Sequence, residues 1–129
     1  MILDTGFLID LLAGDPDAEV VADELDESGR AAVSVITVME LYEGIHLAER
    51  TDQEHRRVVE LLDGINSRPV TGDVATTAGE VSAVLSQRGL PVGVEDVLIG
   101  STALVANEPV VTRNVRHFER IDGLDVREY

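Results

Sequence analysis

Short apolar runs that pass directly into helical patterns constrain the fold of this chain more than any other feature of its sequence. Ile2–Leu3, Ala31–Val35 and Pro109–Thr112 are too short for helices and consist mainly of aliphatic or β-branched residues, which predicts buried strands. After the first two runs, apolar residues recur at three- and four-residue spacing, as in amphipathic helices. Strands that alternate with helices favour a parallel sheet covered on both faces.

The remaining elements follow from turn residues and periodicity. We expect a weak strand at Arg68–Thr71, a terminal edge strand at Leu124–Arg127 and a short helix that starts at Asn114. The longer helices are predicted from Phe7 to Gly14, from Pro16 to Gly29, from Thr37 to about Ala48, from Thr51 to Gly64, from Gly72–Asp73 to Arg88–Gly89, and from Val94 or Glu95 to about Ala106. The fold class is therefore α/β, with a central, mostly parallel sheet of four to five strands.

Length and composition predict one globular domain. The chain has 129 residues, of which 44% are apolar, which is enough to bury a sizeable core. Residues 1–129 are expected to form a single domain. No leader and no apolar window long enough for a membrane span is visible, so we expect a cytoplasmic protein with no membrane partner. The absence of cysteine fits a reducing compartment and excludes thiolate chemistry.

The charge balance is strongly acidic. Twenty-five Asp and Glu residues face ten basic residues, all of them arginine, for a formal charge of −15. Without lysine, Walker-type phosphate loops and Schiff-base chemistry are excluded. Such a surface repels nucleic acid at ordinary ionic strength, but at roughly 1 M salt the Debye length falls to about 3 Å. We therefore interpret the composition as that of a halophilic protein.

Three carboxylates lie where apolar runs give way to helical patterns. Asp4 follows the first strand, Glu40 lies in the first turn of the helix expected from Thr37, and Asp96 lies in the first turn of the helix expected from Val94. Each has a structural alternative, because Asp4 is a plausible N-cap, Thr37 to Glu40 matches a capping box, and Asp96 complements a helix dipole. All three adjoin apolar segments, however, and a carboxylate near a core needs an arginine or a cation as its partner. Clustered carboxylates favour Mg²⁺ or Mn²⁺.

Four stretches resemble the PIN-domain family and, within it, the VapC-type ribonuclease toxins of toxin–antitoxin systems. The stretches are Ile2–Thr5, Ser34–Gly44, Asp96–Ala103 and Val111–Phe118. The resemblance covers the whole chain and implies a PIN-like three-layer sandwich. It also implies an endoribonuclease that hydrolyses RNA phosphodiesters with Mg²⁺ (Mn²⁺ as a substitute) bound by Asp4, Glu40 and Asp96. A small antitoxin partner and a homodimer are implied as well.

The chain departs from the family at the fourth acidic position. Many relatives carry aspartate or glutamate within the segment from Thr112 to Phe118, where this chain has Asn114 and His117. We assign Asn114 to the catalytic set as a neutral ligand for metal, water or phosphate, and expect one metal ion more readily than two. Other candidates near substrate are Thr5, Thr112, Arg113, Arg116 and His117.

The polar candidates have structural alternatives too. Arg113, Arg116 and Arg120 either meet phosphate or pair with nearby acids, and Asp10 either faces solvent or pairs with an arginine. His46 and His55 are expected at the surface.

Two other function classes share these features. A catalytically silent PIN-like module would use the acidic face to bind a basic protein, and the neutral Asn114 and His117 favour it. A metal-dependent phosphatase or DNA nuclease would use the same carboxylates. Titration with Mn²⁺ separates the binding module from the enzymes, and assays on RNA, DNA and a phosphomonoester separate the enzymes from one another.

Overall fold

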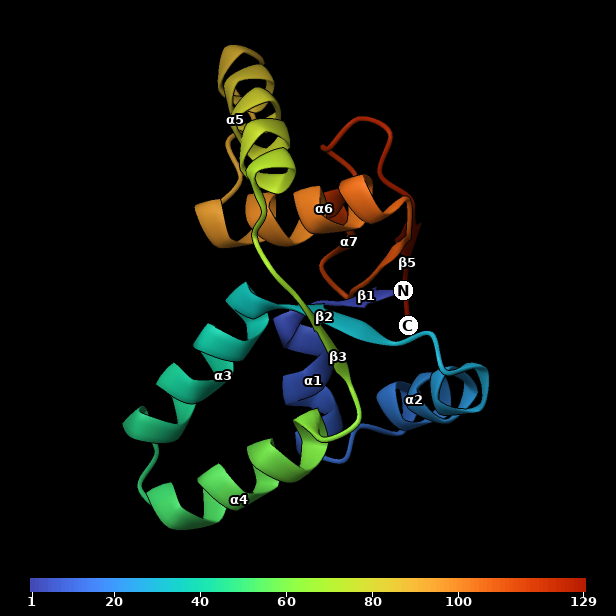
Figure 1. Cartoon of the computed structure of the whole chain (residues 1–129), viewed down its shortest axis with the longest axis vertical. Coiled ribbons are helices and arrows are strands. Elements are labelled where there is room, and N and C mark those ends of the chain that lie inside the picture. The colour runs from blue at the N-terminus through green and yellow to red at the C-terminus, as the bar shows by residue number, and fades with distance from the viewer.

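Five strands form a single parallel sheet in the computed structural model, which describes residues 1–129 (Figure 1). The strand order is β3-β2-β1-β4-β5, and every neighbouring pair is parallel. The strands are β1 (Ile2–Leu3), β2 (Ala32–Ser34), β3 (Asn66–Arg68), β4 (Val110–Val111) and β5 (Val126–Arg127). The expected fold class is confirmed, with five strands and helices on both faces.

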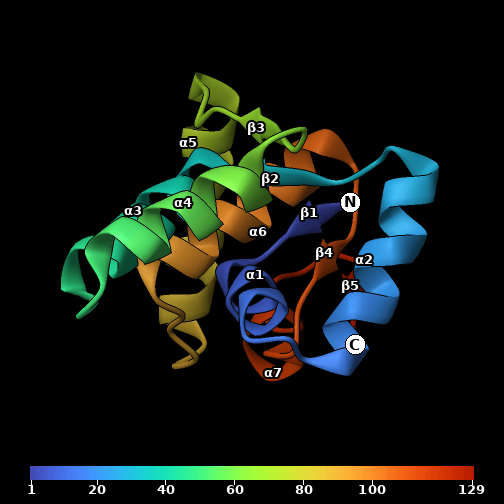
Figure 2. The same ribbon diagram turned by 90° about the horizontal axis from the view of Figure 1, so that it is seen from below.

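Seven helices cover the sheet in two outer layers. Figure 1 shows α5, α6 and α7 on one side of the sheet and α1 to α4 on the other, and Figure 2 shows the second group in front. The helices are α1 (Thr5–Leu12), α2 (Pro16–Ser28), α3 (Val35–Leu47), α4 (Thr51–Leu62), α5 (Gly72–Gln87), α6 (Val94–Ala106) and α7 (Val115–Phe118). None of them combines the length and the apolar character that crossing a membrane requires.

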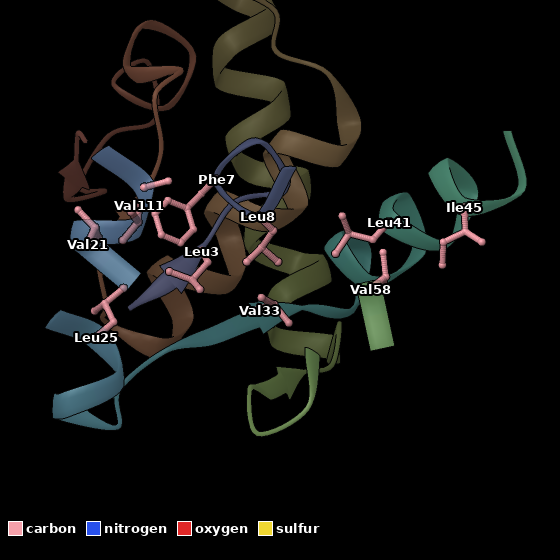
Figure 3. Close-up of a cluster of buried hydrophobic side chains, with 11 residues drawn as sticks. Leu3, Phe7, Leu8, Val21, Leu25, Val33, Leu41, Ile45, Val58 and Val111 are labelled. Carbon is pink, nitrogen blue, oxygen red and sulfur yellow. The ribbon is translucent and has the colours of Figure 1, made fainter. Parts of the chain in front are cut away.

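Successive side chains of the three central strands point to opposite faces of the sheet, so the core consists of two clusters. Leu3, Val33 and Val111 point to the layer that contains α1 to α4, where they meet Phe7 and Leu8 (Figure 3). The neighbouring residues Ile2, Ala32 and Val110 belong to the cluster under α5, α6 and α7. Because both faces of these strands are buried, their sequences are continuously apolar instead of alternating.

The carboxyl ends of the central strands bring three segments to one edge of the sheet. Asp4 follows β1, Ser34 ends β2 and caps α3, and Thr112 follows β4. β1 pairs with both β2 and β4, so these ends are neighbours in space. In parallel α/β sheets this edge is where ligands bind.

α1, α3 and β3 lie elsewhere than predicted, and α1 begins at Thr5, two residues before Phe7. α3 begins at Val35, two residues before Thr37, because the hydroxyl of Ser34 accepts the Ile36 amide 3.1 Å away and caps the helix. β3 spans Asn66–Arg68 instead of Arg68–Thr71. All three of its residues are exposed at the edge of the sheet, so no apolar pattern marks them. The predicted segment includes Pro69, which has no amide to donate to a ladder.

Gly100 allows α6 to approach the chain that follows α7. A Cβ at this position would lie 2.7 Å from Cδ1 of the buried Ile121, which is closer than real side chains pack. The lack of a side chain at Gly100 therefore permits close packing at this point of the second core cluster.

Candidate metal centre and active site

Asp4 is the buried centre of the candidate site. It is the N-cap of α1, it is only 6% exposed, and Phe7 N donates to its Oδ1 at 2.7 Å. The Thr112 hydroxyl donates to Oδ2 at 2.5 Å. Burial raises the pKa of Asp4 from 3.8 to about 6; the two hydrogen bonds oppose this rise, and the charges of Asp96 and Asp10 add to it. Asp4 is thus both a helix cap and a carboxylate close to Asp96.

Glu40 is tied to the same edge through the residue that follows Asp4. Its Oε1 accepts a hydrogen bond of 2.7 Å from the Thr5 hydroxyl, which also lies 3.1 Å from the hydroxyl of buried Thr37. The capping-box alternative is wrong, because Ser34 caps α3 and Glu40 is the sixth residue of that helix. Glu40 was predicted in the first turn of this helix. It lies one turn further along instead, where its side chain reaches Thr5 of α1.

Asp96 joins Asp4 through a chain of polar contacts. Its Oδ2 lies 3.4 Å from Nδ1 of His117, and the same Nδ1 lies 2.8 Å from the Asn114 amide nitrogen. The backbone amide of Asn114 donates to the Thr112 hydroxyl at 2.9 Å, and that hydroxyl bonds Asp4. Asp96, in the first turn of α6, is about one-third exposed. The predicted residues Asn114, His117 and Thr112 thus connect two of the three carboxylates.

The donor set fits a hard divalent ion, although the side chains do not form a closed cage. Asp4 is a buried carboxylate with no ion pair within the chain, which is the condition that a bound cation would relieve. No group of three or more acidic or histidine side chains lies close enough together to hold a metal ion. Instead, one carboxylate oxygen of Glu40 faces the Thr5 hydroxyl, and one carboxylate oxygen of Asp96 faces the His117 ring. That all three carboxylates share one ion stays a prediction.

Arg113 pairs with acidic side chains beside the site. Its guanidinium bonds Asp15 at 3.2 Å through both terminal nitrogens and lies 3.5 Å from Asp10. These pairs raise the pKa of Arg113 and lower that of Asp15, chiefly through the hydrogen bonds between them. The alternative in which Arg113 pairs with nearby acids is therefore the one observed.

The other basic candidates differ in whether their side chains have a partner within the chain. Arg116 is exposed and makes no side-chain hydrogen bond or ion pair, whereas Arg120 reaches the Pro91 carbonyl at 3.4 Å. His46 and His55 are exposed, as expected. Of the three arginines in this segment, Arg116 alone is free to meet a phosphate.

Comparison with known proteins identifies the family. A family model described as the PIN domain matches residues 1–124. The chain belongs to the PIN-domain family. It is 33% identical to the tRNA(fMet)-specific endonuclease VapC of Salmonella typhimurium and 31% identical to the protein of the same name from Shigella flexneri. Each match covers 99% of this chain and 96% of the relative.

A solved structure agrees with this placement. The crystal structure of DNA-bound VapBC from Salmonella typhimurium superposes with a TM-score of 0.91 at 28% identity, over 98% of this chain and 96% of the other. The resemblance to VapC-type PIN domains is thus confirmed by sequence and by fold. The candidate site of this PIN domain is centred on Asp4, with Glu40 tied to it through Thr5 and Asp96 through His117, Asn114 and Thr112.

One residue beside the site was missed by the sequence analysis. The Tyr129 hydroxyl donates to Asp10 at 2.7 Å, and its ring contacts Phe7 and Arg113. Burial raises the pKa of Tyr129 above its usual range, and hydrogen bonding to Asp10 and the charge of Asp4 act in the same direction. No sequence signal connects Tyr129 to Asp10, because the two residues are separated by almost the whole chain.

Proposed function

We propose that this PIN domain is a divalent-metal-dependent endoribonuclease, the toxin of a toxin–antitoxin pair, with Mg²⁺ as its cofactor and Mn²⁺ as a substitute. The observation that carries the proposal is the buried Asp4 carboxylate, which lacks a cationic partner and feels the charge of Asp96. The VapC names of its relatives support ribonuclease activity. We treat residues 1–129 as one catalytic domain.

The three carboxylates would have different roles in metal binding and catalysis. Asp4 and Asp96 would bind the ion directly, because the remaining lone pairs of their oxygens are available beyond the contacts with Phe7, Thr112 and His117. Glu40 would complete the set or accept a proton from the attacking water at Oε2, since Oε1 faces Thr5.

The neutral residues of the site would orient its charged ones. Thr5 and Thr112 hold Glu40 and Asp4, respectively, through hydroxyl hydrogen bonds. Asn114, placed by its amide bond to Thr112, would contact water or phosphate together with His117. Exposed Arg116 is the basic side chain we assign to the RNA backbone. A bound divalent ion would supply positive charge against the phosphate and lower the pKa of its water.

An antitoxin and a second copy of the chain complete the proposal. The structural relative above is a VapBC assembly, which supports a small antitoxin as a partner. Val35 and Met39, one helical turn apart on α3, remain 37% and 49% exposed, and such side chains support a homodimer. Light scattering in multimolar KCl tests the dimer. We place the enzyme in the cytoplasm, where its RNA substrates would be.

Replacement of Asp96 tests the metal site. Asp96→Asn keeps the shape of the side chain and removes its charge, so we expect Mn²⁺ binding to weaken and RNA cleavage to fall by about a hundredfold. Asp73→Asn is the matched control, because Asp73 is also acidic, lies in the first turn of α5 and is exposed. Calorimetric titration with Mn²⁺ and cleavage of RNA, including tRNA, measure the two effects. Equal activity in the parent and in Asp96→Asn would contradict the assignment.

The same experiments separate the alternative functions. A catalytically silent binding module predicts no Mn²⁺ site that depends on Asp96, and the absence of a ready-made three-residue metal cluster gives that alternative its support. A DNA nuclease or a phosphatase predicts binding of Mn²⁺ but faster cleavage of single-stranded DNA or of a phosphomonoester than of RNA. Parallel assays on the three substrates therefore decide among these classes.

A further inference from the structure

Tyr129 contacts three side chains from two different parts of the chain near Asp4. Its hydroxyl donates to Oδ2 of Asp10 at 2.7 Å. Its ring packs edge-to-face on Phe7, with centroids 4.9 Å apart and an angle of 87° between the planes. The guanidinium of Arg113 lies 4.6 Å from the centre of the same ring. Tyr129 therefore links the first turns of α1 to the segment between β4 and α7.

These two segments are the ones that hold the Asp4 carboxylate. The amide of Phe7 donates to Oδ1 of Asp4 at 2.7 Å. Thr112, the residue before Arg113, donates from its hydroxyl to Oδ2. The Tyr129 ring contacts Phe7, whose amide holds Oδ1 of Asp4. It also contacts Arg113, the residue after Thr112, whose hydroxyl holds Oδ2. A shift of either segment would turn the carboxylate.

The position of the ring is itself well determined. Phe7 is fully buried, which fixes one side of the contact. Arg113 is held by Asp15 at 3.2 Å and lies 3.5 Å from Asp10, the residue that also accepts the Tyr129 hydroxyl. Asp10, Arg113 and Tyr129 therefore contact one another in a closed triangle. Such a triangle resists the movement of any one member.

We propose that Tyr129 is a positioning residue for Asp4: it holds the start of α1 and the Thr112–Arg113 segment at the spacing that orients both oxygens of the carboxylate. The inference rests on the proposed role of Asp4 as a metal ligand. It differs from a simple packing role, because packing alone would affect the free energy of unfolding without a specific effect on metal affinity.

Substitution of Tyr129 tests this role in the full chain. Tyr129→Ala removes the ring and the hydroxyl, and we expect the affinity for Mn²⁺ to fall about tenfold, as for other residues that orient metal ligands. Tyr129→Phe keeps the ring and removes the bond to Asp10, so we expect a loss of about threefold, the size of a weak hydrogen bond. Calorimetry measures the affinity, and thermal unfolding measures the stability of each variant.

Tyr42 supplies the matched control. It is the other tyrosine of the chain, it is half-buried on α3, and its ring packs edge-to-face on His55 with centroids 5.9 Å apart. Tyr42→Ala therefore removes a comparable ring contact away from Asp4. We expect it to lower the unfolding temperature while leaving the affinity for Mn²⁺ within about twofold of the parent value.

A second measurement is independent of metal. Hydrogen exchange of the Phe7 amide reports its bond to Asp4, and the Val74 amide, bonded to the Thr71 hydroxyl at 3.2 Å at the start of α5, serves as the reference. We expect exchange at Phe7 to accelerate about tenfold in Tyr129→Ala and about threefold in Tyr129→Phe, with no change at Val74. The Phe variant decides the question if the Ala variant does not fold.

The possible outcomes are distinguishable. An affinity for Mn²⁺ and a Phe7 exchange rate that stay within twofold of the parent in the Tyr129 variants would overturn the inference. An equal loss of affinity in Tyr42→Ala would also overturn it, since the effect would then be general packing. If the parent binds no Mn²⁺, the proposed function fails, and the exchange of the Phe7 amide alone decides whether Tyr129 positions Asp4.

Discussion

Asp4→Asn is expected to stabilise the metal-free protein while it removes the proposed metal ligand. The rise in the pKa of Asp4 from 3.8 to about 6 corresponds to about 3 kcal/mol against the ionised carboxylate in the folded chain. Asparagine keeps the oxygen that accepts the Phe7 amide, but it leaves the Thr112 hydroxyl without its anionic acceptor, a loss of about 1 kcal/mol. The free energy of unfolding should therefore increase by about 2 kcal/mol at pH 7.5.

The pH dependence of this difference follows from the direction of the pKa shift. Above pH 6, Asp4 is ionised in both the folded and the unfolded chain, so the full destabilisation is present. As the pH falls through about 6 towards 3.8, the folded chain takes up the proton first, and the destabilisation disappears. The advantage of Asp4→Asn should therefore be largest at neutral pH and vanish near pH 4.

Urea unfolding of both proteins in a chelator at pH 7.5 and pH 4 measures this difference. Comparing two proteins at each pH cancels the titration of the many other acidic residues, as long as those residues are distant from Asp4. Added Mn²⁺ should raise the stability of the parent and leave the variant unchanged, because only the parent keeps the proposed metal ligand. The reasoning is refuted if Asp4→Asn is less stable than the parent in chelator at pH 7.5, or if its advantage persists at pH 4.

Three further predictions follow from single features of the chain. Thr5→Val removes the 2.7 Å bond to Glu40 and should lower kcat on RNA about tenfold with little change in KM, and an unchanged kcat would argue against an orienting role. Gly100→Ala places a Cβ 2.7 Å from Ile121 and should cost about 1–3 kcal/mol in urea unfolding, whereas Gly79→Ala, with open space around it on α5, should be neutral or stabilising. The thermal midpoint should rise between about 0.1 M and about 2 M KCl, because salt screens the net charge of −15, and a flat or falling midpoint would contradict the halophilic interpretation.

Much of the fold could be predicted because both faces of its central strands are buried. Ile2–Leu3 and Val110–Val111 are short but apolar throughout, and each lies between turn or helix signals that bound it. β3 was misplaced because an exposed edge strand of Asn66, Ser67 and Arg68 has no apolar signature. The order of the strands in the sheet depends on how helices pack across it, which local sequence patterns do not encode.

The candidate carboxylates could be proposed from the sequence, but their hydrogen-bond partners could not. The junction between β1 and α1 pointed to Asp4, whereas Asp96 lies in the first turn of α6, which follows α5 without a strand between them. The role of Glu40 stays a prediction, and only its capping-box alternative is wrong, since Ser34, not Thr37, caps its helix. The bond from Thr5 to Glu40 and the contacts of Tyr129 join residues distant in the sequence, and no local periodicity reports such contacts.

The brevity of the strands has an evolutionary consequence. β1 and β4 contain two residues each, and each strand contributes one residue to either core cluster. An insertion or deletion of one residue in such a strand would exchange the two faces and carry Asp4 or Thr112 to the wrong side of the sheet. Helices and surface loops of related sequences can therefore vary in length, while the spacing between Met1 and Asp4 and between Pro109 and Thr112 is expected to tolerate no change.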